Sequence, residues 1–112
     1  MAGKDPGDLV WTTWGTDGFL YPAIVVRLEG PTAHVAYLDG DEGDVPVSGL
    51  FVTEIPVGQR VNMNWKGQRT YYNGQVVAKI GMAIDVAYDD GDRGWGTIAQ
   101  CRVQTSQPPR LS

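Results

Sequence analysis

Three aromatic residues and two carboxylates are spaced along the first half of the chain in a way that suits recognition of a cation. Trp14 and Tyr21 lie on either side of an Asp-Gly turn signal, so antiparallel pairing brings their rings together. Tyr37 and Asp39 are two residues apart and share one strand face, with Asp41 two residues further on. Rings around a gap with a carboxylate at its rim attract an alkylated ammonium, each ring contributing about 0.5 to 2 kcal/mol. The spacing therefore predicts a cation box that suits methylated lysine, whereas plain lysine keeps its water.

The same arrangement occurs a second time further along the chain. Shifted by 51 positions without a gap, segment 7–52 matches segment 58–103 at 15 of 46 positions. The second set consists of Trp65, Tyr72, Tyr88, Asp90 and Asp92. This duplication predicts two similar units at 8–54 and 58–104, with flexible tails at 1–7 and 105–112.

Short strands separated by turns are expected to position these residues. Alternating apolar residues and Gly, Asp and Pro turn signals predict strands in the first unit at 8–14, 19–28, 32–38, 44–47 and 50–54. The corresponding strands of the second unit are expected at 59–65, 70–80, 82–88, 95–98 and 101–104. Alternation fails along 24–26, which predicts a bend. The pattern favours an all-β chain of two tandem, small, five-stranded SH3-like barrels, whose short connector requires them to touch or exchange strands.

The two units differ in charge. Segment 7–52 holds seven acidic residues and one basic residue, a net charge of −6, whereas segment 58–103 holds six basic and four acidic residues, a net charge of +2. An acidic first unit favours cationic ligands, and the weakly basic second unit is compatible with nucleic acid.

Cysteine usage and hydropathy indicate the compartment. Cys101 is the single cysteine, so it cannot form an internal disulfide, and its alignment with Leu50 predicts a buried thiol. No apolar run approaches the roughly 18 residues of a membrane span, and residues 1–8 lack the apolar stretch expected of a signal peptide. We therefore expect an intracellular protein without a membrane partner, nuclear in a eukaryote and cytoplasmic in a bacterium.

A longer pattern resembles a known family. Val-x-x-x-Trp, a turn ending in x-Tyr-Pro-Ala, and Val-Ala-Tyr-Leu-Asp-Gly-Asp-x-Gly-x-Val are similar to the Tudor domain, and the doubled copy resembles the tandem Tudor and Agenet-like methyl-lysine readers of the Royal superfamily. The resemblance covers about 9–103. It implies one cage of Trp14, Tyr21, Tyr37 and Asp39, and a second cage of Trp65, Tyr72, Tyr88 and Asp90.

The chain departs from that family at one cage position. Where the family often has a further aromatic residue, this chain has Asp41 and Asp92, which favours mono- or dimethyl-lysine because these ligands keep an N–H to donate. The resemblance implies a non-catalytic chromatin reader, without a cofactor, that binds a methylated lysine or arginine in a basic peptide such as a histone tail.

Other interpretations stay open. The rings could serve packing alone, and the second unit could be a scaffold for nucleic acid or protein. The residues that would serve nucleic acid are Lys66, Arg69, Lys79, Arg93 and Arg102 for phosphates, and Tyr71 or Trp95 for base stacking.

The remaining signals are weaker. Trp11 and Trp95 each occur in one repeat only and are interpreted as contacts between units or as accessory ligand walls. The single histidine, His34, is expected on the surface of a strand. An enzyme fits least, because no nucleophile–base pair or phosphate-binding loop is visible. The Asp-rich loops 39–44 and 89–92 do not match a calcium loop, so no metal is expected.

Overall fold

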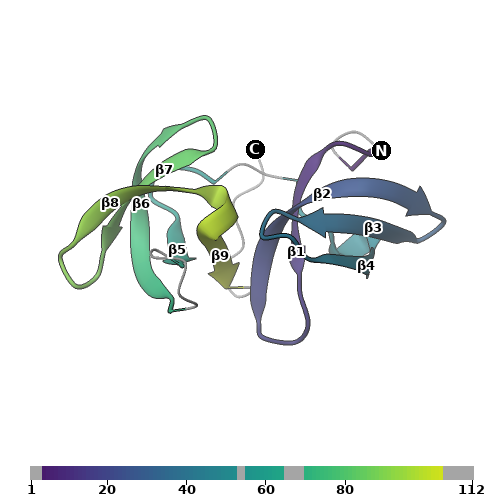
Figure 1. The fold of residues 1–112 in the computed structure, drawn as a ribbon, viewed down its shortest axis with the longest axis horizontal. Helices are drawn as coiled ribbons and strands as arrows, with labels where there is room; N and C mark the ends of the chain where they lie inside the picture. The colour runs from purple at the N-terminus through teal and green to yellow at the C-terminus, as the bar shows by residue number, and fades with distance from the viewer. Residues whose placement is uncertain (1–3, 53–54, 65–69, 105–112) are drawn as a thin grey trace.

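The structure, a computed structural model, describes residues 4–52, 55–64 and 70–104, and within these ranges the fold is all-β with strongly curved strands (Figure 1). The first half contains β1 (Leu9–Thr13), β2 (Phe19–Glu29), β3 (Thr32–Tyr37), β4 (Glu42–Pro46) and the 3-10 turn η1 (Val47–Gly49). The second half contains β5 (Arg60–Met63), β6 (Tyr72–Ile80), β7 (Ala83–Tyr88), β8 (Arg93–Thr97), the 3-10 turn η2 (Ile98–Gln100) and β9 (Cys101–Gln104). None of the helical segments that the structure describes has the length and apolar character needed to cross a bilayer.

The strands of the described residues pair antiparallel, and each half repeats one hairpin pattern. β2 pairs with β1 and β3, and β3 pairs with β4. Likewise, β6 pairs with β5 and β7, and β7 pairs with β8. β9 pairs with both β5 and β2, so it joins the halves into one continuous sheet, and Figure 1 shows it beside β2 at the junction. The expectation that the two halves touch is confirmed.

Each half bends its second strand at the same place. The β2–β3 register shifts between Val25 and Arg27, where Val26 is an additional, exposed residue. The β6–β7 register shifts between Val76 and Ala78. An extra residue in one strand bends it and increases its twist, which lets the strand curl around a small core. The bend predicted at 24–26 is therefore confirmed, and it recurs in the second half.

The strand predicted at 50–54 is wrong over its described part. Phe51 makes one isolated bridge with Trp11, in which each backbone N–H donates to the other residue's carbonyl at 2.9 and 2.8 Å. Leu50 and Val52 belong to no strand, and 53–54 lie outside the described residues. The equivalent segment of the second half, β9, also follows a 3-10 turn but pairs with both β5 and β2, whereas the described part of 50–54 pairs only through Phe51 with Trp11.

Two hydrophobic clusters fill the fold, and one of them crosses the junction. The first cluster contains Val10, Ala23, Val25, Ala33, Val35, Tyr37 and Leu50, all from the first half. The second cluster is built on β5 to β9 but also contains Trp11 and Leu20. Trp11 is only 1% exposed, which confirms the interpretation that it packs between the halves. Cys101 is also buried in the second cluster, as predicted, and this burial raises the pKa of its thiol.

Candidate ligand-binding groove

Three neighbouring strands place the predicted aromatic residues of the first set on one face. Tyr21 of β2 lies opposite Thr12 of β1, and Trp14 follows the end of β1. Tyr37, the last residue of β3, lies opposite Ala23, two residues after Tyr21. The ring centroids of Trp14 and Tyr21 are 6.3 Å apart with an interplanar angle of 68°, and those of Tyr21 and Tyr37 are 6.5 Å apart at 89°. The structure therefore brings the three rings together, each steeply inclined to the next.

The three rings differ in how open they are to a ligand. Trp14 is 48% exposed, Tyr21 is half-buried and Tyr37 is only 5% exposed. The Tyr37 hydroxyl donates a hydrogen bond to the carbonyl of Thr13, and its ring belongs to the first hydrophobic cluster. Burial, and secondarily the nearby carboxylates, raise the pKa of Tyr37. Trp14 and Tyr21 thus form an accessible corner, which Tyr37 supports from the core.

A groove of about 680 Å³ runs along this corner and continues onto the second half. The lining residues are Trp14, Asp17, Tyr21, Asp39 and Asp41 from the first half, and Asn64, Tyr71, Ala99, Gln100, Cys101 and Arg102 from the second. The prediction from sequence missed Asp17, although its position in the turn before Tyr21 is a signal that could have found it. Oδ2 of Asp17 lies 3.7 Å from Nη1 of Arg102, so Asp39 and Asp41 are the carboxylates beside the two rings that make this part of the groove suited to a cation.

The Tyr21 hydroxyl is held in a fixed orientation at the centre of the groove. It donates to Oδ2 of Asp17 at 2.5 Å and accepts from Nη1 of Arg102 at 2.8 Å. Burial, followed by the hydrogen bond to Asp17, raises the pKa of Tyr21 to about 12, against an opposing effect of Arg102. The hydroxyl therefore stays protonated at neutral pH, and the two hydrogen bonds fix the position of its oxygen.

Arg102 lies beside the groove and contacts both halves of the chain. Its guanidinium carbon lies 3.8 Å from the ring centroid of Phe19 and 3.6 Å from that of Tyr71, so it is stacked between one ring from each half. Its Nε donates to Oδ1 of Asn62 at 2.7 Å. Because a planar guanidinium can stack on rings and donate in its plane at once, one side chain satisfies all these contacts. Arg102 is therefore part of the junction.

The second predicted set is described in part. Tyr72 and Tyr88 have ring centroids 6.3 Å apart at 82°, which repeats the inclined pair of the first half. Tyr88 is buried, and burial raises its pKa. Asp90 and Asp92 lie in the exposed turn after β7, where Oδ1 of Asp90 accepts from the backbone N–H of Asp92 at 3.0 Å. Trp65 lies outside the described residues.

Comparison with known proteins identifies structural neighbours only. No protein-family model matches the chain, and no curated protein matches it. The solved structures that resemble it include the following two. Both are Agenet domains. AGD34 of Arabidopsis thaliana AGDP1 is 12% identical, with a TM-score of 0.47 over 98% of this chain and 90% of that chain. Tandem Agenet domain 3-4 of ADCP1 is 12% identical, with a TM-score of 0.45 over 98% of this chain and 89% of that chain.

The basic residues considered for nucleic acid are partly engaged within the chain. Nε and Nη2 of Arg93 donate to Oδ2 of the buried Asp85 at 3.0 and 2.8 Å, and Arg102 is held in the junction. Of the other candidates, Lys79 lines a different pocket, and Lys66 and Arg69 lie outside the described residues. The two candidates for base stacking differ in whether their rings are already stacked. The Tyr71 ring is stacked on Arg102, whereas the Trp95 ring is exposed on β8.

His34 lies on β3, and Figure 1 places this strand in the first half. Its Nδ1 is 2.8 Å from Oδ1 of Asp44, and its Nε2 is 2.9 Å from Oε1 of Glu42, both on β4. These two hydrogen bonds, that to Glu42 first, raise the pKa of His34. Among the residues the structure describes, no three His, Cys, Asp or Glu side chains form a group that could hold a metal.

Proposed function

We propose that the chain is a non-catalytic binding module that recognises a methylated lysine, or a methylated arginine, in a basic peptide such as a histone tail. The observation that carries this proposal is the corner formed by Trp14 and Tyr21, whose rings meet at 68° along a groove with three carboxylates. An alkylated ammonium can give up its weakly held water and lie against ring faces, and carboxylates at the rim complement its charge. Inside the cell, such a module binds proteins that carry basic, histone-like tails.

The carboxylates favour particular methylation states. Asp39 and Asp41 line the same groove as Trp14 and Tyr21. A mono- or dimethylated ammonium keeps an N–H that can donate a charge-assisted hydrogen bond to such a carboxylate, whereas a trimethylated ammonium has none. We expect the lower methylation states to bind more tightly, and Asp39→Asn to reduce this preference.

We infer further that the chain is organised as two tandem Tudor-like barrels at 8–54 and 58–104, the second with five strands and the first with four strands and the Phe51 bridge in place of the fifth. Both halves have the same hairpin order and the same bend. The Trp11–Phe51 bridge of the first half corresponds, after the shift of 51 positions, to the Asn62–Arg102 pair between β5 and β9. This equivalence supports one closing contact per unit, reduced to a single residue pair in the first.

The second set is proposed as a further cage. It comprises Trp65, Tyr72, Tyr88, Asp90 and Asp92, and the inclined rings of its two tyrosines support the proposal. Because the first half is the more acidic, we expect the first cage to bind a basic peptide more tightly than the second.

A titration followed by ¹H–¹⁵N NMR tests the proposed function. The intact chain is mixed with one basic peptide carrying un-, mono-, di- or trimethylated lysine. We expect saturable shifts at the Trp14 indole that require methylation, and loss of binding in Trp14→Ala. Trp95→Ala is the matched control, because Trp95 is similarly exposed but does not line the groove. Equal binding of the unmethylated peptide, or preferential binding of a DNA oligonucleotide that weakens steeply with salt, would contradict the proposal.

A further inference from the structure

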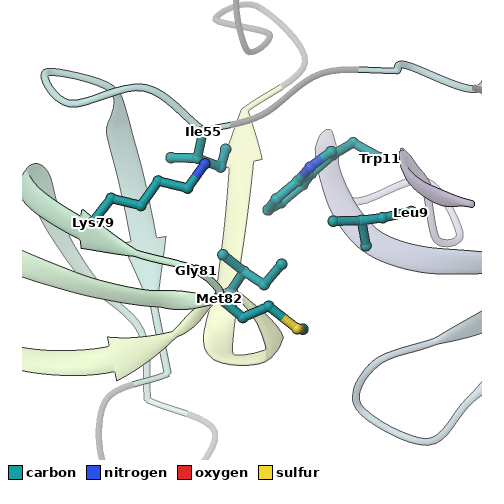
Figure 2. A pocket seen from close by; sticks show the side chains of 7 residues that line it. Leu9, Trp11, Ile55, Lys79, Gly81 and Met82 are labelled. Atoms are coloured by element: carbon teal, nitrogen blue, oxygen red, sulfur yellow. The ribbon is translucent and has the colours of Figure 1, made fainter.

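A second pocket lies at the junction of the two halves. It has a volume of about 430 Å³, within the range of about 300 to 1,000 Å³ that is typical of small-molecule sites. Its lining residues are Leu9, Trp11, Ile55, Lys79, Gly81, Met82 and Ile98 (Figure 2). It shares none of its described lining residues with the groove. The turn η2 lies between them, with Ile98 in this pocket and Gln100 in the groove.

The lining of this junction pocket is apolar except at one end. Leu9, Ile55 and Met82 contribute hydrocarbon and thioether surface, and Met82 is 52% exposed and unbranched, so it can adapt to a ligand. Lys79 is the one charged residue among the described lining residues. Figure 2 shows its side chain reaching from β6 toward Ile55. Since an ammonium has three N–H donors, it can bind a carboxylate oxygen beside any partner it already has.

Trp11 forms the wall that the first half contributes, and Figure 2 shows its indole extending toward the pocket. Its Nε1–H is buried and has no hydrogen-bond partner in the structure. Buried polar groups are nearly always hydrogen-bonded, and an indole nitrogen can only donate. An acceptor on a ligand that displaces the side chains next to Trp11 would therefore satisfy this N–H.

We propose that the junction pocket binds a small ligand with an apolar body and a single carboxylate. The carboxylate pairs with the ammonium of Lys79, the apolar body lies against Leu9 and Met82, and the Trp11 indole donates to a ligand oxygen. This chemistry is opposite in charge to that of the groove, where Asp39 and its neighbouring carboxylates select a cation. The two sites therefore discriminate between ligands of the same shape by the sign of their charge.

A pair of matched probes tests this site in the intact chain. 4-Phenylbutyrate and 4-phenylbutylamine share an apolar body and differ in charge, and the indole ¹H–¹⁵N signals report on each tryptophan separately. We expect phenylbutyrate to shift the indole signal of Trp11 and the methyl signal of Met82 in a saturable manner, with little effect at Trp14. Phenylbutylamine is expected to leave Trp11 unchanged. Equal shifts of Trp11 by both probes, or none with phenylbutyrate, would overturn the proposal.

Variants identify the groups responsible. Lys79→Met keeps most of the apolar stem and removes the charge, so it should weaken phenylbutyrate binding about tenfold, as expected for loss of one charge-assisted contact. Lys79→Glu reverses the charge and should weaken phenylbutyrate binding further. Arg27→Glu is its control, because it makes the same change in net charge at an exposed site on β2. Trp11→Phe removes the indole N–H but keeps an aromatic ring, so it should weaken phenylbutyrate binding, as followed at the Met82 methyl signal. If that variant does not fold, the comparison of Lys79→Glu with Arg27→Glu decides, and equal affinity in both would refute the proposal.

Discussion

Trp14 and Tyr37 both belong to the aromatic set predicted in the first half, but the structure places them in different surroundings. Trp14 is 48% exposed on the groove, so Trp14→Ala should remove ligand binding and change the free energy of unfolding by only about 0.5 kcal/mol. Tyr37 is 5% exposed in the core, so Tyr37→Ala should destabilise the fold by about 3 to 5 kcal/mol. Urea unfolding and peptide titration of both variants measure this contrast. A large loss of stability in Trp14→Ala would contradict the assignment of Trp14 to the ligand site.

His34 gives the first half a pH-dependent contribution to stability. The hydrogen bonds to Glu42 and Asp44 raise the pKa of His34 above its ordinary value of 6.5, and the nearby Arg27 opposes them. A group with a raised pKa in the folded state stabilises the fold below its unfolded pKa, and this stabilisation is lost as the pH rises through the folded pKa. His34→Gln should therefore destabilise the protein more at about pH 5 than at about pH 9. Urea unfolding of both proteins at the two values tests this, and an equal difference would contradict it.

At the level of single residues, sequence reasoning reached the contacts that antiparallel hairpins dictate. The approach of Trp14 to Tyr21 follows from their spacing across one turn, and that of Tyr21 to Tyr37 from pairing of the next two strands. The role of Arg102 at the junction could not be predicted from the sequence. Its hydrogen bond to Tyr21 joins residues 81 positions apart, and no local periodicity encodes such a contact.

Among the elements, β6 shows that the two copies of the repeat are not interchangeable. Gly74 of β6 corresponds to the buried Ala23 of β2. A Cβ at Gly74 would lie 2.5 Å from Cγ1 of Val86 and 2.9 Å from the carbonyl oxygen of Ala87. Gly74→Ala should therefore destabilise the fold by about 1 to 3 kcal/mol through overpacking, although the first copy carries alanine. Urea unfolding measures this. The control is Gly43→Ala on β4, where a Cβ meets only Tyr37 Cε2 at 3.7 Å, and equal effects would contradict the argument.

The elements also show where pattern reasoning fails. The bend of β2 was predictable, because alternation of apolar and polar residues breaks down where Val26 is inserted. The end of the first unit was not, because a run such as Leu50 to Val52 is equally apolar in a strand and in a single bridge. The difference lies in the available partners, since β9 pairs with both β5 and β2 whereas Phe51 bridges to Trp11 only.

On the scale of the whole molecule, the halves share both a strand and a core. β9 pairs with β2 through Phe19–Gln104 and Leu20–Val103, and Leu20 itself packs in the second hydrophobic cluster. The cation stacking of Arg102 crosses the same junction. Repeats of about 50 residues bury little surface alone, so sharing these contacts stabilises both. The duplication in the sequence predicted two units, but it contained no signal for how completely they depend on each other.

This dependence predicts that the chain unfolds as one cooperative unit. Trp11 belongs to β1 but is buried in the cluster built on β5 to β9, so Trp11→Ala should cost about 3 to 5 kcal/mol and weaken both halves together. The amide signals of Val35 in β3 and Val86 in β7 follow each half during urea unfolding. Their midpoints should coincide in the wild type and shift together in Trp11→Ala, whereas Trp95→Ala, which removes an exposed ring from β8, should leave both nearly unchanged. If the folded-state signal of Val35 persists to a higher urea concentration than that of Val86, the first half is stable alone. The junction pocket and the groove then lie between two independent domains.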